Sequence, residues 1–422
     1  MSLSIDELLA LPAIPFLGLA QLMRFNFRNA DMLPLHQRLI DQAVANPDDA
    51  GALLDASVLL QFYDKPALAL LLQREALSTR RHYAFPARQT PRLRLLALMA
   101  PGGLMANQPV ECLLENSDVE LDLYYASAGR FIPDEIPPHD VLLVAMSETD
   151  DNRPLLDFWQ PILAQWPRPV LNCPANIQRV ARDAAAALLS TLPGVMVPLT
   201  YRVGRQQLVA VRDAQAVLPI DFPVLVRPVN SHAGNDFYKL DSREALGTVL
   251  TQIPGDELFV SGFVDYRSAD GQFRKYRVIL IDGCPYACHM GISDHWMIHY
   301  LNAGMADSAE KRAEEARFMA TFDADFAVRH AAALAGIHAR IGLDYLGIDC
   351  AETPDGRLLV FEIDHAMVVH AMDPVALYPY KQPAMQKLFG AFRAMLIKAA
   401  DRGAAPPVGD RPAQTSSGAD AS

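Results

Sequence analysis

The hydrophobic and polar residues of this chain follow three different patterns along its length. Residues 31–85 place apolar residues at helical spacing in three consecutive segments, with Pro47 and Pro66 where helices end or begin. From residue 91 onward, short apolar runs alternate with helical stretches, which predicts a small parallel sheet. From residue 198 onward, strands mix with helices, and turn signals predict antiparallel hairpins.

These patterns predict an α/β plus α+β chain of several regions. Its hydrophobic content of 51% supplies ample material for their cores. The expected regions are a helical module at 1–90, an α/β domain at 91–197, an α+β domain at 198–400 and a disordered tail rich in Ala, Pro, Gly and Ser at 401–422.

The helical region allows two interpretations. Its sequence pattern, NPDDAGALLDASVLL followed by ALALLLQREAL, resembles one tetratricopeptide repeat with its partner helices. One repeat cannot bury its own apolar face. The region is therefore either a helical cap packed on the rest of the protein or a module that binds a protein partner.

The α/β region lacks two common nucleotide motifs. No GxGxxG spacing follows its first strand, and no GxxxxGK[ST] occurs in the chain, so a dinucleotide site and a P-loop are unsupported. The Ala-rich segment at 176–195 is predicted to be a helical connector.

Charge and cysteine content narrow the protein class. The net charge is −12, from 37 basic and 49 acidic residues, which argues against nucleic-acid binding through bulk charge. No segment has the pattern of a membrane span, and an oligomer is compatible with the sequence. The five cysteines form no CxxC pair, which favours reduced thiols and a cytoplasmic location.

Residues 346–364, LGIDCAETPDGRLLVFEID, place three acids on two apolar strands. The turn TPDGR predicts a hairpin, and Glu362 and Asp364 are two apart, so they project to one face. If Asp349 pairs across the hairpin, three carboxylates converge, and such a cluster needs neutralisation. Hard oxygen ligands suit Mg²⁺, which brings phosphates with it. Structurally, Asp349 could instead cap the turn, and Glu362 could pair with an arginine such as Arg357 or Arg340.

Residues 222–240, FPVLVRPVNSHAGNDFYKL, have the features of a phosphate loop. Arg227 lies near the end of one strand, a loop of small residues follows at 230–235, and a second strand ends at Lys239. Small residues let backbone N–H groups approach an anion, and a cation on the adjacent strand adds charge-assisted hydrogen bonds.

The order of these segments resembles the ATP-grasp superfamily, specifically ribosomal-protein glutamate ligases and glutathione synthetases. The strand–loop–strand unit precedes the hydrophobic strand ELFVSGFV, then KYRVILIDG, and the acidic hairpin closes the series over 198–400. The α/β region resembles that superfamily's preceding domain. The resemblance implies ATP held between two α+β subdomains with Mg²⁺, or Mn²⁺ as an alternative. A carboxylate substrate is then phosphorylated, an amine attacks the acyl phosphate, and ADP and phosphate are released.

The resemblance also implies roles for individual residues. Arg227 replaces the usual phosphate-binding lysine, Ser231, His232 and Gly234 belong to the phosphate lid, and Arg277 reaches the phosphate or acyl phosphate. The remaining candidates are Lys239, Phe259, Val260, Phe263, Asp265 and Lys275 for the nucleotide, and Asp349, Glu362 and Asp364 for the metal. The chain departs from the family pattern in reading E-I-D instead of E-x-N, in lacking a Gln-Glu pair in its hinge, and in carrying Lys275 where many relatives have an acid.

The segment CHMGISDHWMIHYLNAGM, residues 288–305, supplies histidines for the substrate. By position, His289 and His299 are predicted to bind the acid substrate or to act as general base for the amine. They could instead be hydrogen-bonded within a loop. His295 and His299 would share one face of a helix, as zinc ligands can, but no H-E-x-x-H motif is present.

The leading interpretation is an ATP- and Mg²⁺-dependent ligase for a small-molecule or peptide carboxylate and an amine. Two alternatives stay open. A kinase of the same fold would stop at phosphorylation, and a binding protein with a degraded site would only sense nucleotide. The sequence does not name the substrates.

Overall fold

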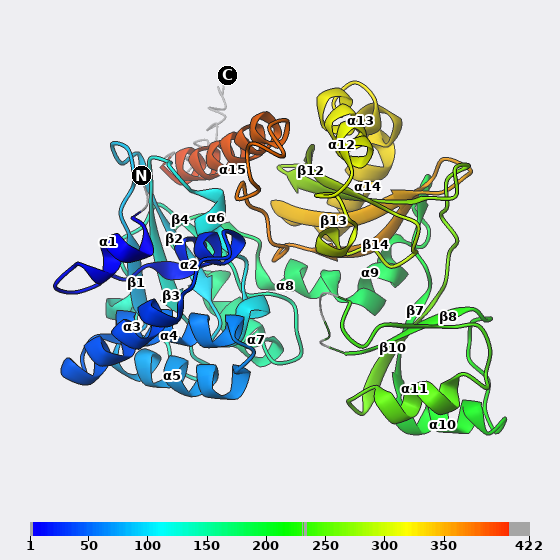
Figure 1. Ribbon diagram of the computed structural model, residues 1–422, viewed down its shortest axis with the longest axis horizontal. Helices are drawn as coiled ribbons and strands as arrows, with labels where there is room; N and C mark the ends of the chain where they lie inside the picture. Colours follow the sequence, from blue (N-terminus) through cyan, green and yellow to red (C-terminus); the bar gives the residue numbers. More distant parts are fainter. Residues whose placement is uncertain (1–2, 230, 232–233, 405–422) are drawn as a thin grey trace, which may run out of the picture.

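The computed structural model describes residues 3–229, 231 and 234–404, which form a mixed α/β fold with three sheets (Figure 1). Within these residues, no helix combines the length and apolar character needed to cross a membrane. His232 of the predicted lid and residues 405–422 of the predicted tail lie outside the described residues.

The N-terminal region folds into five helices with a core of their own. The three segments expected from the sequence are helices, and two further helices precede them. Leu22, Leu35 and Leu59 are fully buried where these helices meet. The five are α1 (Ile5–Leu9), α2 (Gly18–Phe27), α3 (Leu33–Ala45), α4 (Ala50–Phe62) and α5 (Pro66–Thr79).

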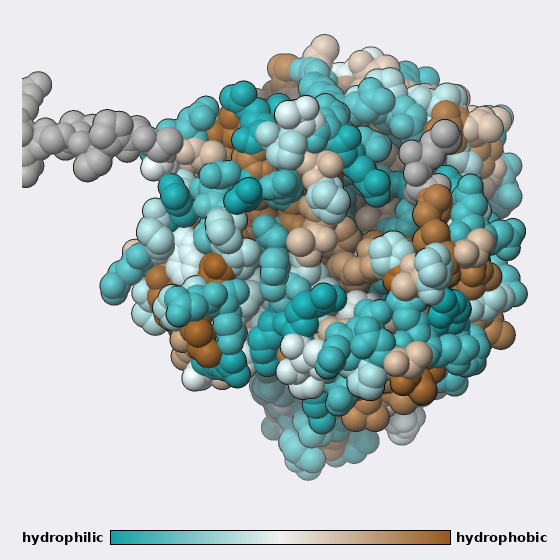
Figure 2. All heavy atoms as spheres, turned by 90° about the vertical axis from the view of Figure 1, so that its left-hand side faces the viewer, coloured by the Kyte–Doolittle hydropathy of each residue, from teal (hydrophilic) through white to brown (hydrophobic). Residues whose placement is uncertain are grey.

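The outer face of this helical region is largely polar. Figure 2 shows mostly hydrophilic side chains there, with apolar ones in small groups between them. Leu68, Leu70 and Leu71 of α5 are among the exposed apolar residues. The resemblance to a tetratricopeptide repeat and the binding of a partner remain predictions.

The first sheet has the strand order β1-β3-β2-β4-β5. The other four strands, in the order β3-β2-β4-β5, pair in parallel, as the sequence pattern predicts. β1 is an antiparallel edge strand that comes from the end of the region expected to be helical. The strands are β1 (His82–Phe85), β2 (Leu93–Met99), β3 (Val119–Tyr125), β4 (Val141–Val144) and β5 (Val170–Leu171), and η1 (Leu104–Ala106), α6 (Val110–Leu113), η2 (Pro133–Glu135) and α7 (Arg153–Leu163) connect them.

The predicted connector helix is broken into three pieces. α8 (Pro174–Ile177) continues into η3 (Gln178–Val180), and α9 (Arg182–Leu189) follows. Ala181 between them has ψ of 138°, an extended value that interrupts the helical hydrogen bonds. The single-helix prediction was wrong, and the break places Arg182 at the start of α9.

The second sheet is a small antiparallel unit with the strand order β7-β10-β8-β9. Val226 and Val260 on its inner face are fully buried against the two helices that cover it, at the lower right of Figure 1. Its elements are β7 (Thr200–Gly204), α10 (Arg205–Arg212), β8 (Val224–Pro228), β9 (Tyr238–Leu240), α11 (Leu246–Gln252) and β10 (Glu257–Gly262).

The third sheet, in the order β12-β11-β13-β14-β6, contains the predicted acidic hairpin. β13 and β14 pair antiparallel, with Asp349 directly opposite Glu362. The elements are β6 (Val195–Met196), β11 (Phe273–Ile281), β12 (Cys284–Ser293), η4 (Tyr300–Asn302), α12 (Ala309–Thr321), α13 (Phe326–Arg329), α14 (Ala331–Ile341), β13 (Tyr345–Glu352), β14 (Leu358–Asp364) and α15 (Lys381–Ala404).

Helix α15 joins the first and third sheets into one core. Its Leu388 and Phe392 are fully buried with residues of both sheets, including Leu95 and Ile279. The helix continues to Ala404, so the first four residues of the predicted disordered tail are helical.

Two buried carboxylates hold the N-terminus of α2. Asp55 accepts hydrogen bonds from the backbone N–H groups of Leu17 (2.7 Å) and Gly18 (2.9 Å), and Glu111 accepts one from Ala20 (2.7 Å). These groups satisfy N–H donors that have no partner inside the helix. Burial raises the pKa of Asp55 to about 8 and that of Glu111 to about 7.

The pKa values of Asp55 and Glu111 predict that stability falls as the pH rises from 5 to 8. In this window the folded protein binds more protons than the unfolded chain, whose carboxyls titrate near 4, so each group contributes at most about 1.4 kcal/mol per pH unit. Urea unfolding at several pH values should show a smaller slope in the variant Asp55→Asn/Glu111→Gln than in wild type. The exposed Asp48→Asn is the control, and an unchanged slope in the double variant would contradict the assignment.

Candidate functional site

A cavity of about 310 Å³ lies between the second and third sheets. Strands β8 and β10 supply one wall, and β11, β13 and β14 supply the other. Residues 296–299 and α9 complete the lining. The phosphate-loop segment and the acidic hairpin, more than a hundred residues apart in the sequence, therefore meet at one space.

Asp349 is a buried carboxylate held by two cations. Its Oδ1 lies 2.7 Å from Arg277 Nε, and its Oδ2 lies 3.0 Å from Arg277 Nη2 and 2.6 Å from Lys275 Nζ. The charges of Arg277 and Lys275 outweigh the effect of burial and hold the pKa of Asp349 well below its usual range. Asp349 therefore does not cap the turn, and it fixes the positions of Arg277 and Lys275 instead.

Glu362 and Asp364 project from β14 into the same cavity. Glu362 forms an ion pair with Arg182 of α9, whereas Arg357 pairs with Asp355, and Arg340 donates to Leu188 O at 2.8 Å. Neither arginine suggested by the sequence is the partner of Glu362. Asp364 Oδ1 accepts from the backbone of Ala366 at 2.8 Å.

The ion-pair contact of Asp364 among the described residues is with His365 Nδ1 at 3.7 Å, and burial lowers the pKa of that imidazole to about 4, so it brings no charge at neutral pH. Burial, followed by the charge of Glu362, raises the pKa of Asp364 to about 7. A carboxyl that resists ionisation beside a second carboxylate is a place where a cation is electrostatically favoured.

The metal prediction for the acidic trio is supported only in part by this geometry. The described residues contain no group of three or more His, Cys, Asp and Glu side chains placed to hold a metal ion. Asp349 is turned toward Lys275 and Arg277. Glu362 and Asp364 still fit Mg²⁺, which typically binds one or two carboxylates together with phosphates and water. Metal ligation by all three acids remains a prediction.

Arg227 is a buried cation on the opposite wall. Its side chain has no ion-pair partner among the described residues, and its Nε donates to Ser231 Oγ at 2.9 Å. Its guanidinium lies 5.2 Å from the ring centroid of Phe237. Burial, together with the nearby charge of Arg182, lowers the pKa of Arg227 to about 9. Both effects disfavour the charged form and would be offset by a bound anion.

Aromatic side chains line the part of the cavity next to Arg227. Phe237, Phe259, Phe263 and Trp296 all contribute, and the Trp296 ring lies 5.3 Å from Phe237 and 5.8 Å from Phe263, centroid to centroid. These rings form a surface suited to a flat heterocycle.

Val260 does not line this cavity. Successive side chains of a strand alternate between faces, so Phe259 faces the cavity and Val260 lies in the core of the second sheet. The assignment of the Val260 side chain to the nucleotide was therefore wrong.

Two other nucleotide candidates, Lys239 and Asp265, do not themselves line the cavity. Lys239 pairs with Asp241 at 2.9 Å and lies 4.5 Å from the Phe263 ring centroid. Asp265 pairs with Arg267 at 3.0 Å. Gly234 does line the cavity, with φ of +78°, a left-handed conformation that favours glycine.

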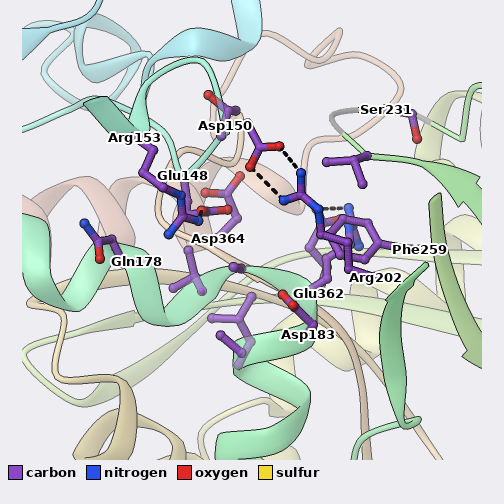
Figure 3. Close-up of a pocket in the computed structure, with 17 residues that line it drawn as sticks. Glu148, Asp150, Arg153, Gln178, Asp183, Arg202, Ser231, Phe259, Glu362 and Asp364 are labelled. Atoms are coloured by element: carbon purple, nitrogen blue, oxygen red, sulfur yellow. Dashed lines mark hydrogen bonds and ion pairs between the residues drawn. The ribbon is translucent and has the colours of Figure 1, made fainter. Parts of the chain in front are cut away.

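A second compartment, of about 290 Å³, opens beside Glu362 and Asp364 (Figure 3). Ser231 contributes to its lining. Three further acids, Glu148, Asp150 and Asp183, belong to the first sheet's loops and to α9. Arg202 spans this compartment's edge, with Asp150 at 2.9 Å and Glu257 at 2.5 Å. Arg153 pairs with Glu148, and Arg182 with Glu362, so this lining holds five carboxylates and three arginines.

The predicted histidines lie in different places. His299 lines the main cavity, and His289 lines an adjoining chamber instead. β12 ends at Ser293, and residues 294–299 are not helical, so His295 and His299 do not form the helical pair considered for zinc. Burial and the charges of nearby cations lower the pKa of both His289 and His299.

Gly347→Ala should destabilise the acidic hairpin. A Cβ on Gly347 would lie 2.8 Å from Asp364 O and 2.7 Å from Met367 Sδ, so β13 and β14 must shift, at about 1–3 kcal/mol. Gly390→Ala is the control, because nothing lies within 4 Å of its added Cβ in α15 and a helix gains about 0.5–1 kcal/mol from the change. Urea unfolding measures both, and equal effects would contradict the close approach of the strands.

No protein-family model and no curated protein matches this chain. Several solved structures resemble it in part. A RimK domain ATP-grasp protein from Sphaerobacter thermophilus is 17% identical, with 72% of this chain and 99% of that chain covered and a TM-score of 0.41. The VanG D-Ala:D-Ser ligase from Enterococcus faecalis is 12% identical, with 73% and 100% covered and a TM-score of 0.45. The D-alanine–D-alanine ligase from Bacillus anthracis complexed with ATP is 14% identical, with 74% and 98% covered and a TM-score of 0.42. The overlap with each is partial, and the functional assignment rests on the cavity.

Proposed function

We propose that this protein is an ATP-grasp ligase that uses ATP and Mg²⁺ to join a carboxylate to an amine. One observation carries the proposal. A single cavity places the buried Arg227, which has no ion-pair partner among the described residues, on one wall, and the acids Glu362 and Asp364 on the other. A nucleotide phosphate would neutralise the first, and its metal ion would neutralise the second.

The lining of the cavity suits ATP in one orientation. The adenine would pack among Phe259, Phe263 and Trp296, and the phosphates would extend past Arg227 toward β14. Glu362 and Asp364 would hold Mg²⁺, which neutralises charge on the phosphates during transfer.

The chain's own residues would act mainly by position and charge. Asp349 and the carbonyl of Val368 fix the Arg277 guanidinium at 2.7 Å and 3.0 Å, so it would meet developing negative charge without reorganisation. Lys275 adds a second fixed cation. Burial and the charges of Lys275 and Arg277 lower the pKa of His299, which favours the neutral form that can accept a proton from an attacking ammonium group.

The compartment of Figure 3, in which carboxylates outnumber arginines by five to three, is the proposed approach for the amine. Glu148, Asp150 and Asp183 line it, and it shares Glu362 and Asp364 with the main cavity. An ammonium group is attracted to such a surface before it loses its proton. The carboxylate would then occupy the opposite, cationic side near Arg277.

The test is nucleotide turnover with purified protein and Mg²⁺. A ligase should release ADP and phosphate only when a carboxylate and an amine are both present, and hydroxylamine should trap the acyl phosphate as a hydroxamate. ADP release that needs only the acid would identify a kinase. Binding of ATP by calorimetry without turnover across a broad panel of acids and amines would favour a nucleotide sensor and refute the ligase.

A further inference from the structure

The chamber that His289 lines is a third space, of about 260 Å³, which adjoins the main cavity at Lys275 and Arg277. These two cations and His299 line both spaces. The chamber therefore starts where the reacting carboxylate of the proposed substrate would lie, and it extends away from the nucleotide.

The charged side chains that line this chamber are mostly cations, set among apolar residues such as Met23, Phe27 and Leu301. Its charged and imidazole side chains are Lys275, Arg277, Lys381, His289, His299, His370 and Asp373. Asp373 is the one carboxylate among the described residues that line it, and Lys381 Nζ already holds it at 2.9 Å. Lys275 and Arg277 also pair with Asp349, which lines the main cavity and not this chamber. Within the lining itself, three cations face one carboxylate, which favours an anion over an ammonium group.

His289 is a donor without a strong partner. Its ring packs on Tyr300 at 4.6 Å between centroids, and its Nδ1 lies 4.0 Å from Cys288 Sγ, the one hydrogen-bond contact of its ring with the described residues. Burial and the charges of Arg277, Lys381 and Lys275 lower its pKa well below the ordinary value. A bound anion would relieve that repulsion and accept its N–H.

Helix α2 of the N-terminal region closes the chamber. Met23 and Phe27 line it, and the Phe27 ring meets the His370 ring edge-on at 4.4 Å. Asp55 and Glu111 anchor the start of the same helix. The N-terminal helices therefore contribute directly to a cavity that shares Lys275, Arg277 and His299 with the candidate site.

We propose that this chamber binds a second carboxylate of the substrate, so that the acid which the enzyme activates is a small dicarboxylate. The inference rests on the proposed function, because it places the first carboxylate beside Arg277 and the nucleotide. The donors of the chamber select the second carboxylate, and Met23 and Phe27 limit the length of the carbon chain between the two.

Calorimetry with the full-length protein tests the chamber separately from turnover. Malonate, succinate and glutarate are compared with propionate and butyrate, in the presence and absence of Mg²⁺ and a non-hydrolysable ATP analogue. At least one dicarboxylate should bind at least about tenfold more tightly than the monocarboxylates, because a charge-assisted hydrogen bond is worth that factor or more.

Two variants assign the discrimination to this chamber. His289→Phe keeps a ring against Tyr300 but removes the donor, and it should weaken dicarboxylate binding about tenfold. Phe27→Ala removes the α2 wall and should weaken it by a similar factor. Neither should change affinity for the ATP analogue. The exposed Asn26→Ala on the same helix is the control and should change neither affinity.

Dicarboxylates that bind no better than monocarboxylates, or discrimination that survives both variants, would overturn the inference. Dicarboxylate discrimination in a protein that does not bind the ATP analogue would refute the proposed function and leave the chamber as an anion site. If the protein binds the ATP analogue but does not bind dicarboxylates more tightly than monocarboxylates, the carboxylate site in the chamber is refuted and the proposed function is not.

Discussion

Glu362→Gln should reduce kcat/KM for Mg²⁺-dependent ADP release on the order of a hundred- to a thousandfold, the effect of removing one charged group that acts in a phosphoryl-transfer site. Glutamine keeps the size of the side chain and an oxygen for Arg182, so the fold should be retained. It removes one of the two negative charges that would hold Mg²⁺. Half-saturation by Mg²⁺ should therefore shift to higher concentration, which a metal titration of the turnover rate measures.

The matched control lies in the same hairpin. Asp355→Asn removes an acid from the exposed turn between β13 and β14, where Asp355 pairs with Arg357 and faces no cavity. It should leave turnover and the Mg²⁺ dependence unchanged. If a folded Glu362→Gln protein has wild-type kinetics, Glu362 is not a metal ligand, even where the protein binds the nucleotide.

The acidic hairpin could be predicted from the sequence because its signals are local. The TPDGR turn sets the register, and the alternation of a strand places Glu362 and Asp364 on one face. The parallel strands of the first sheet could be predicted for the same reason, since each is a short apolar run followed by turn residues.

The partners of these acids could not be predicted, because they come from distant parts of the chain. Arg182 meets Glu362 across 180 residues, after a break in the helix that the Ala-rich composition did not signal. Arg277 stands opposite Asp349 through the register of β11 and β13, which no local pattern fixes. This pairing leaves Asp349 already neutralised, whereas the sequence suggested an acid that awaits a metal.

The placement of α2 is a second example. Met23 and Phe27 have the spacing of ordinary packing residues, and the sequence offers no sign that they reach His370. Packing of the N-terminal helices on the loop after β14 brings them there. Trp296 likewise lines the main cavity from a loop, a position that only the tertiary fold shows.

Arg227→Met should weaken binding of an ATP analogue about thirty- to a hundredfold without loss of stability. A hydrogen bond to a charged group contributes about 1.5–3 kcal/mol, and Arg227 is the buried cation placed for the phosphates. In the absence of nucleotide, the same cation has no carboxylate partner among the described residues, and its burial is costly. Methionine fills a similar volume without that cost, so the melting temperature should stay equal or rise.

Weaker binding of the ATP analogue at an equal or higher melting temperature is the result expected of a residue that binds the nucleotide. A residue with a purely structural role would show the reverse. The comparison variant is Arg212→Met on α10 of the same unit, where an exposed arginine pairs with Asp213. Calorimetry and thermal unfolding should show wild-type values for it. If Arg227→Met instead unfolds at markedly lower temperature and binds the ATP analogue as tightly as wild type does, then the hydrogen bond from Arg227 Nε to Ser231 Oγ is structural and the phosphates bind elsewhere. Loss of affinity with full stability would place a nucleotide phosphate beside Arg227, on the wall that faces Glu362 and Asp364.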